Sequence, residues 1–178
     1  MEKKKLSLLL ITLVGGLAVI ASYVWGFTAY PDASTTLWGG VPASAIPVYT
    51  TNMLLAAGGF LFFTAYLLFS IDARQAKVFI NYDYRLFISL YAIILVLSAL
   101  WMPFSIAAYY QSSIAFLWVV RLVLWITGLA SLALLAALLT LQPRGRSWVH
   151  WAAVVGCIFF CVQTVILDAV TWVIFFKI

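Results

Sequence analysis

The chain has 178 residues, of which 66% are hydrophobic and only 8% are charged, and its formal net charge is +5. A soluble core of this size could not remove so much apolar surface from water, so the composition excludes a soluble globular domain and is typical of helical membrane proteins. The few basic residues stand beside apolar runs, which indicates membrane topology and no nucleic-acid partner.

The apolar runs are long enough to cross a bilayer core, which takes about 20 residues. The first follows a basic start that would also suit a cleavable signal peptide, but its length favours a transmembrane helix. The five predicted helices are 6–27, 48–71, 86–109, 114–141 and 149–176. We expect a single transmembrane domain, residues 1–178, folded as an all-α integral membrane bundle of five helices.

The longest connection, residues 28–47, contains three prolines and therefore cannot form one continuous helix. Its apolar residues, Trp38 among them, are too numerous for a solvated loop. We expect it to cap one end of the bundle, with Trp38 substantially buried. The alternative is an aromatic segment that lies among lipid headgroups.

Basic residues indicate the orientation of these helices in the membrane. Loops 28–47 and 110–113 have no Lys or Arg, and Lys177 is the exception at the chain end. By the positive-inside rule, the N-terminus is predicted to be cytoplasmic and the C-terminus to lie on the opposite side. The basic residues on the predicted inner side are Lys3, Lys4, Lys5, Arg74, Lys77, Arg85, Arg144 and Arg146.

The last predicted helix carries polar residues in an otherwise apolar run. At ordinary α-helical spacing they share one face. A carboxylate such as Asp168 in this setting is costly and marks a functional or structural polar site with a partner. The residues on this face are His150, Cys157, Cys161, Thr164, Asp168 and Trp172.

Arg121 is the predicted partner of Asp168. A rise of about 1.5 Å per residue places both roughly 10–12 Å below the outer ends of their helices, and these two helices are joined by a short turn. We therefore expect a bidentate contact between Arg121 and Asp168. Such a pair would either fix the register of the two helices or form part of a ligand site.

Aromatic and polar side chains are predicted to gather in the outer half of the bundle. A concave, aromatic-lined site with a few polar groups suits a small apolar ligand. Many of the aromatic residues could instead be anchors at the membrane interface. The predicted ligand-binding residues are Trp38, Asn52, Ser98, Trp101, Tyr109, Trp118, Arg121, Trp125, Asp168 and Trp172.

The sequence offers little for other chemistry. His150 stands near the inner end, far from Asp168, so these residues predict no metal cluster. There is no pair of His for haem, no nucleotide-binding glycine loop and no second intramembrane carboxylate for acid–base work. We predict no metal and no cofactor, and assign no catalytic residue.

Two segments are similar to motifs of the tryptophan-rich sensory protein, or translocator protein, family (TspO/MBR). They are residues 97–104, Leu-Ser-Ala-Leu-Trp-Met-Pro-Phe, and residues 164–168, Thr-Val-Ile-Leu-Asp, followed by Trp172. Ser98 and Asp168 stand where the family has Asn, and its Pro-Tyr-x-x-Trp motif is absent from the last helix. The resemblance implies a five-helix bundle, often dimeric, that holds a porphyrin, sterol or similar ligand beneath the first loop.

Three functions remain open. The first is a membrane receptor or carrier for a small hydrophobic ligand (tetrapyrrole, sterol or lipid-like) in an outer-half pocket. The second is a non-catalytic subunit or assembly factor of a larger membrane complex, with partner helices on apolar faces such as 132–141. The third is an intramembrane enzyme on a lipid or isoprenoid, which is disfavoured because Asp168 paired with Arg121 would be a poor proton donor. Expected partners are membrane lipid, the ligand, and a second copy or another membrane protein.

Overall fold

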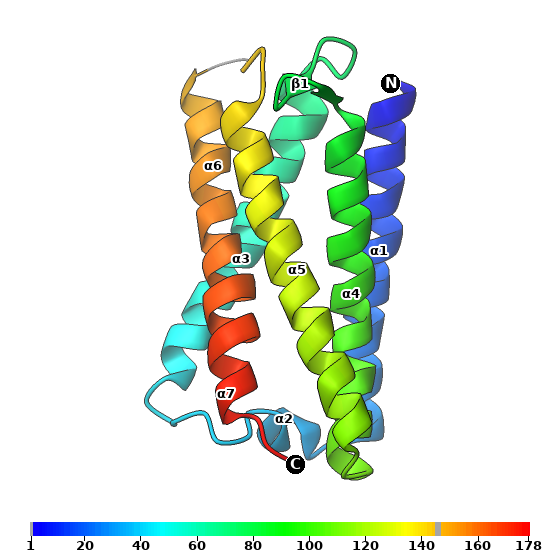
Figure 1. Cartoon of the computed structure of the whole chain (residues 1–178), viewed down its shortest axis with the longest axis vertical. Helices are drawn as coiled ribbons and strands as arrows, with labels where there is room; N and C mark the ends of the chain where they lie inside the picture. The colour runs from blue at the N-terminus through cyan, green and yellow to red at the C-terminus, as the bar shows by residue number, and fades with distance from the viewer. Residues whose placement is uncertain (1, 145–146) are drawn as a thin grey trace.

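The computed structural model describes residues 2–144 and 147–178. Five helices in this part of the chain are long and apolar enough to cross a membrane, as predicted, and they form one bundle (Figure 1). The largest difference in bounds is at the first helix, which begins at Lys3 instead of Leu6. In chain order the elements are α1 (Lys3–Ala29), α2 (Ala33–Thr36), α3 (Ile46–Ala65), η1 (Tyr66–Ser70), β1 (Lys77–Val78), β2 (Tyr82–Asp83), α4 (Arg85–Tyr110), α5 (Ile114–Thr140), α6 (Ser147–Cys161), η2 (Val162–Trp172) and α7 (Val173–Phe175).

The long helices pack as a series of neighbours. α1 packs along α4, α4 along α5, α5 along α6 and η2, and α3 along α6. The N-terminus and β1 lie at one end of the bundle, and the C-terminus and α2 lie at the other (Figure 1). We call these the amino-terminal and carboxyl-terminal ends. This order leaves α1 and α3 as the outermost helices, and these two do not pack closely against each other along their lengths.

Glycines allow the closest helix contacts. A Cβ added to Gly156 of α6 would lie 2.9 Å from the Cα of Gly59 of α3, so these two backbones touch. On α1, a Cβ at Gly15 would lie 2.7 Å from the Cβ of Leu95. The next residue, Gly16, has nothing within 4 Å of such a Cβ. Small residues therefore fix the α3–α6 and α1–α4 crossings, as is common for membrane helices.

The amino-terminal end is held by polar contacts near the short β1–β2 hairpin. Lys4 Nζ lies 2.9 Å from Asp83 Oδ2, and this hydrogen bond lowers the pKa of the Asp83 carboxyl below its ordinary value. The backbone of Lys77 pairs in both directions with that of Gln142, at 2.8 and 2.9 Å. The connection between α3 and α4 is thus a structured hairpin tied to the start of α1 and the end of α5.

All the predicted inner-side basic residues that the structure describes belong to this same end, on α1, the hairpin segment, the start of α4 and the turn after α5. Arg146 lies outside the described residues. The clustering agrees with the predicted topology, whereas the side of the membrane that this end faces stays a prediction.

The first loop covers the carboxyl-terminal end, as predicted. Leu37 and Val41 are buried, and the loop is tied to the end of the last helix. Trp172 Nε1 donates a hydrogen bond to the Leu37 carbonyl at 2.8 Å, and the Gly40 amide donates to the Phe175 carbonyl at 3.1 Å. Trp38 is only partly buried, and its ring packs edge-on against Tyr49, with 5.5 Å between ring centroids.

Candidate functional site: a lateral cavity beneath the first loop

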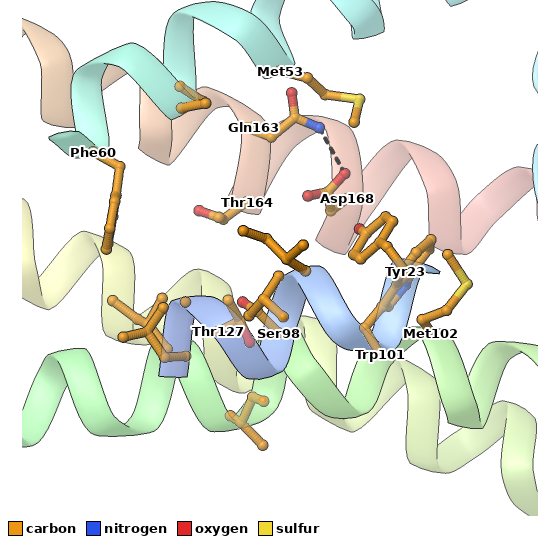
Figure 2. A pocket seen from close by; sticks show the side chains of 18 of the residues that line it. Tyr23, Met53, Phe60, Ser98, Trp101, Met102, Thr127, Gln163, Thr164 and Asp168 are labelled. Carbon is orange, nitrogen blue, oxygen red and sulfur yellow. Dashed lines mark hydrogen bonds between the residues drawn. The ribbon is translucent and has the colours of Figure 1, made fainter. Parts of the chain in front are cut away.

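A cavity of about 710 Å³ lies between α1, α3, α4, α5 and η2, beneath the first loop. Figure 2 shows α3 and η2 on one side of it and α1 and α4 on the other. Its lining is mostly aliphatic and aromatic. Small-molecule sites in proteins are typically apolar and about 300–1,000 Å³ in volume, so the cavity has the size and character of a ligand site.

The cavity opens sideways between α1 and α3. Leu17 and Ile20 of α1 and Leu61 of α3 line it, yet 66%, 61% and 68% of their surfaces are exposed. Near its start α1 packs against η1, where Leu8 is buried, but farther along the two helices do not pack together. The first loop closes the neighbouring end of the cavity. In a bilayer the opening would therefore face lipid.

Asp168 is the one charged side chain that lines the cavity within the described residues. Its Oδ1 accepts a hydrogen bond from Gln163 Nε2 at 2.9 Å, which Figure 2 marks. Gln163 Oε1 in turn accepts from Asn52 Nδ2 at 3.0 Å, and the same Asn52 amide reaches the Phe159 carbonyl at 3.3 Å. This chain of amides from α3 fixes Asp168 in position through one oxygen. In the described part of the chain, the other oxygen has no protein partner.

The π-helical geometry of η2 is what brings Gln163 to Asp168. Residues five apart in an α-helix are about 140° apart around the axis. In a π-helix the backbone bonds run from residue i to i+5, so residues five apart lie above one another. Thr171 Oγ1 shows the same spacing, since it donates to the Ile166 carbonyl at 2.8 Å. Single π turns inside α-helices often mark functional sites.

Backbone carbonyls of η2 accept hydrogen bonds from side chains of two other helices. Tyr49 Oη of α3 donates to the Leu167 carbonyl at 2.6 Å. Trp125 Nε1 of α5 donates to the Ala169 carbonyl at 3.0 Å. These bonds flank Asp168 on both sides in sequence, so the segment that carries the carboxylate is held from both α3 and α5.

The predicted contact between Arg121 and Asp168 is wrong. In the described residues these two side chains form no salt bridge; the Arg121 guanidinium lies over the Trp118 ring, 4.9 Å from its centroid, and its Nε is buried without a partner. The reason is direction around α5. Val123, Leu124 and Thr127 line the cavity, and Thr127 is at the middle of this face. Arg121, six residues before Thr127, lies about 120° away from it around the helix.

The ten residues predicted to bind ligand divide into three groups. Asn52 lies behind Gln163 and supports it without lining the cavity. Tyr109, Trp118, Arg121 and Trp125 also lie outside the cavity; Trp118 and Trp125 have exposed rings, as interface anchors do. The members that the fold brings together around the cavity are Trp38, Ser98, Trp101, Asp168 and Trp172.

Sequence reasoning missed three residues that shape the polar end of the cavity. Gln163 was missed because α-helical spacing would place it on a different face of the helix from Asp168. Tyr23 comes from α1, where its ring stacks on Trp101 with 5.6 Å between centroids and faces Asp168 across the cavity (Figure 2). Tyr49 lines the cavity from α3. The sequence contained a signal for all three, because each is a polar or amphipathic side chain within an apolar transmembrane segment.

The other polar residues of the last helix belong elsewhere. His150 is buried, with Nδ1 3.0 Å from Tyr66 Oη, and its Nε2 has no partner among the described residues. Cys161 Sγ donates to the Ser131 carbonyl at 3.2 Å. The described residues contain no group of three or more His, Cys, Asp or Glu that could hold a metal ion. The predicted common face of six residues is therefore divided between the packed core and the cavity.

Comparisons of the chain with protein-family models, with curated proteins and with solved structures find no match. The resemblance to the TspO/MBR family therefore stays an expectation from short motifs.

Proposed function

We propose that the chain is a multi-pass membrane protein, with its N-terminus on the cytoplasmic side, that binds a small hydrophobic ligand taken up from the lipid phase. The observation that carries this proposal is the lateral cavity, with its mostly apolar lining and, among the described residues, Asp168 as its one charged group. A receptor or carrier for such a ligand needs these features and no reactive group.

The two ends of the cavity differ in chemistry. Phe60 lines one end, with Phe160 packed against it at 5.9 Å between ring centroids, whereas Asp168 and Gln163 lie at the other end (Figure 2). A ligand with an apolar body and one polar group would place the body against the rings and aliphatic side chains. Its polar group would then reach the free oxygen of Asp168. The cavity thus favours amphiphilic ligands with a small head and a compact apolar body.

The route of entry follows from the closed loop and the open side. The hydrogen bonds from Trp172 and Gly40 hold the first loop against the end of the last helix, next to the cavity. The side between α1 and α3 is lined by exposed Leu17, Ile20 and Leu61. A hydrophobic molecule already dissolved in the bilayer would reach the cavity without crossing water.

Gly16 offers a direct test, because it lines the cavity and a Cβ there meets nothing within 4 Å. Gly16→Phe would fill the cavity. Gly58→Phe is a matched control, since Gly58 is also an open helical glycine but lies outside the cavity. Both variants and the parent protein would be purified in detergent and screened by thermal shift against a sterol, a tetrapyrrole and a long-chain alcohol.

We expect at least one class of ligand to raise the unfolding temperature of the parent protein and of Gly58→Phe, and to have no effect on Gly16→Phe. Equal shifts in all three proteins would place binding outside the cavity and contradict the proposal. If none of the ligands binds the parent protein and it instead co-purifies with partner membrane proteins, the alternative function as a subunit of a larger complex is favoured.

A further inference from the structure

The carboxylate of Asp168 has no counter-charge within the described residues. In the described part of the chain no Lys, Arg or His lines the cavity, and Asp168 takes part in none of the three salt bridges. Among these residues its side chain bonds only to the neutral amide of Gln163. A charge held in an apolar environment is costly unless an opposite charge accompanies it. A cation bound in the cavity would offset this cost, because the described residues supply no positive charge there.

Aromatic rings surround this carboxylate. Tyr23 stacks on Trp101, and Trp101 meets Trp172 edge-to-face with 5.7 Å between ring centroids. Tyr49 is held next to Asp168 by its bond to the Leu167 carbonyl. All these rings line the cavity with Trp38. The faces of such rings carry partial negative charge and attract cations, and aromatic cages are a common means of binding quaternary ammonium groups.

The hydrogen-bond chain from Asn52 through Gln163 engages one oxygen of Asp168, and the second oxygen has no partner among the residues that the structure describes. An anionic ligand would be repelled by this oxygen, and a neutral hydroxyl would gain a single hydrogen bond. A cation would gain both the attraction of the carboxylate and that of the rings. Its apolar substituents would bury themselves in the remainder of the cavity.

We propose that the ligand of this cavity is a lipophilic monocation, such as an amphiphilic amine or a quaternary onium compound, whose charge pairs with Asp168 beside the stacked rings of Tyr23 and Trp101. This inference rests on the proposed function, because it names the ligand class of the same cavity.

Tetraphenylphosphonium, tetraphenylborate and tetraphenylmethane test the inference, because they share one shape and differ in charge. Each would be equilibrated with protein in phosphatidylcholine nanodiscs, and binding to empty nanodiscs would be subtracted. We expect saturable binding that is strongest for tetraphenylphosphonium, by about tenfold or more over tetraphenylmethane, and weakest for tetraphenylborate. This comparison uses the unmodified protein and depends on no variant.

Asp168→Asn then removes the charge at constant side-chain size. We expect it to weaken tetraphenylphosphonium binding about tenfold and to leave tetraphenylmethane binding within about twofold. Asp32→Asn, which removes an exposed carboxylate from the loop at the same end of the bundle, is the matched control and should change neither. Should Asp168→Asn fail to fold, Tyr23→Leu replaces it, with an expected several-fold loss for the cation alone.

Saturable binding of tetraphenylmethane with no preference for the cation would overturn this inference and leave the proposed function intact. A cation preference that survives Asp168→Asn would also overturn it. Absence of saturable binding for all three probes would count against both the inference and the proposed function.

Discussion

The two halves of the bundle contain similar aromatic and polar residues, but they use them differently. In the amino-terminal half, Phe63, Tyr66 and Tyr91 are completely buried against one another and against α5 and α6. The Tyr91 and Thr64 hydroxyls bond to each other at 2.8 Å. In the carboxyl-terminal half, the rings surround a cavity and Asp168 keeps one oxygen without a protein partner.

The backbone explains the difference. The touching glycines of α3 and α6 bring the amino-terminal half together, and η1 brings α1 into it. Beyond that point α1 follows α4 instead of α3, and η2 turns its polar side chains toward the space that results. A site for a ligand arises where close packing is relaxed and a polar group is left without a partner. Five predictions test this comparison.

The largest expected effect is on the packed half. Gly156→Leu should destabilise the bundle by about 3 kcal/mol, because the new side chain would meet the backbone of Gly59, which cannot move aside. Gly58→Leu on the exposed side of α3 is the control. The measurement is thermal unfolding in detergent. A Gly156→Leu protein as stable as the control would show that the two helices do not cross closely.

The next largest concerns the hydrogen bonds of the packed half. Tyr66 Oη donates to the Arg144 carbonyl at 2.5 Å and lies 3.0 Å from His150 Nδ1. Tyr66→Phe removes a buried donor and should destabilise the protein by about 1–3 kcal/mol. Ligand binding should not change, because Tyr66 does not line the cavity. Loss of binding with retained stability would mean that the two halves are coupled.

Gln163→Leu should affect both stability and ligand binding. It removes the donor to Asp168 and the acceptor of Asn52, so the carboxylate loses its fixed position. We expect a loss of about 1–2 kcal/mol in stability and a clear weakening of ligand binding, measured by thermal unfolding and nanodisc binding. Gln163→Glu retains the size of the side chain but places a like charge beside Asp168. It should therefore weaken the binding of an anionic probe more than Gln163→Leu does. Unchanged binding in Gln163→Leu would remove Gln163 from the site.

A smaller effect is expected at Arg121, which the fold keeps away from the cavity. Arg121→Leu should change the free energy of unfolding by less than about 1 kcal/mol and leave ligand binding unchanged. In a double-mutant cycle with Asp168→Asn, the two effects on stability should add within about 0.5 kcal/mol. A larger coupling energy would restore the direct contact that the sequence predicted.

The smallest effect is expected at the amino-terminal end. The hydrogen bond from Lys4 lowers the pKa of Asp83 in the folded protein, so the pair stabilises the fold above the unfolded pKa of about 3.9, and this is lost as pH falls through the folded pKa. Because Asp83 is nearly half exposed, the contribution should lie within about 0–1 kcal/mol. Asp83→Asn should therefore lower the unfolding temperature slightly at pH 7. The difference should disappear in strong acid, whereas a constant difference would argue against this ion pair.

The sequence alone determined the five helices, their ends and the clustering of basic residues at one end of the bundle. These features depend on local properties: the length of an apolar run, the prolines that end it and the charges beside it. The capping role of residues 28–47 was predictable for the same reason, because an apolar segment with three prolines must be covered without forming one continuous helix. Asp168 was recognisable as a polar site from its costly surroundings.

Only the tertiary structure decided which residues meet Asp168. Arg121 was predicted to contact Asp168 because the two residues lie at similar depths and their helices are joined by a short turn. Depth along a helix, however, does not determine the direction of a side chain around the helix axis. The π-helical geometry of η2 changes the relative direction of the Gln163 and Asp168 side chains around the helix axis. No residue pattern in the sequence predicts this π-helix. The partial separation of α1 from α3, which creates the cavity and brings Tyr23 to its edge, depends on contacts between distant segments. Local sequence patterns do not encode such contacts, because they arise from how whole helices pack.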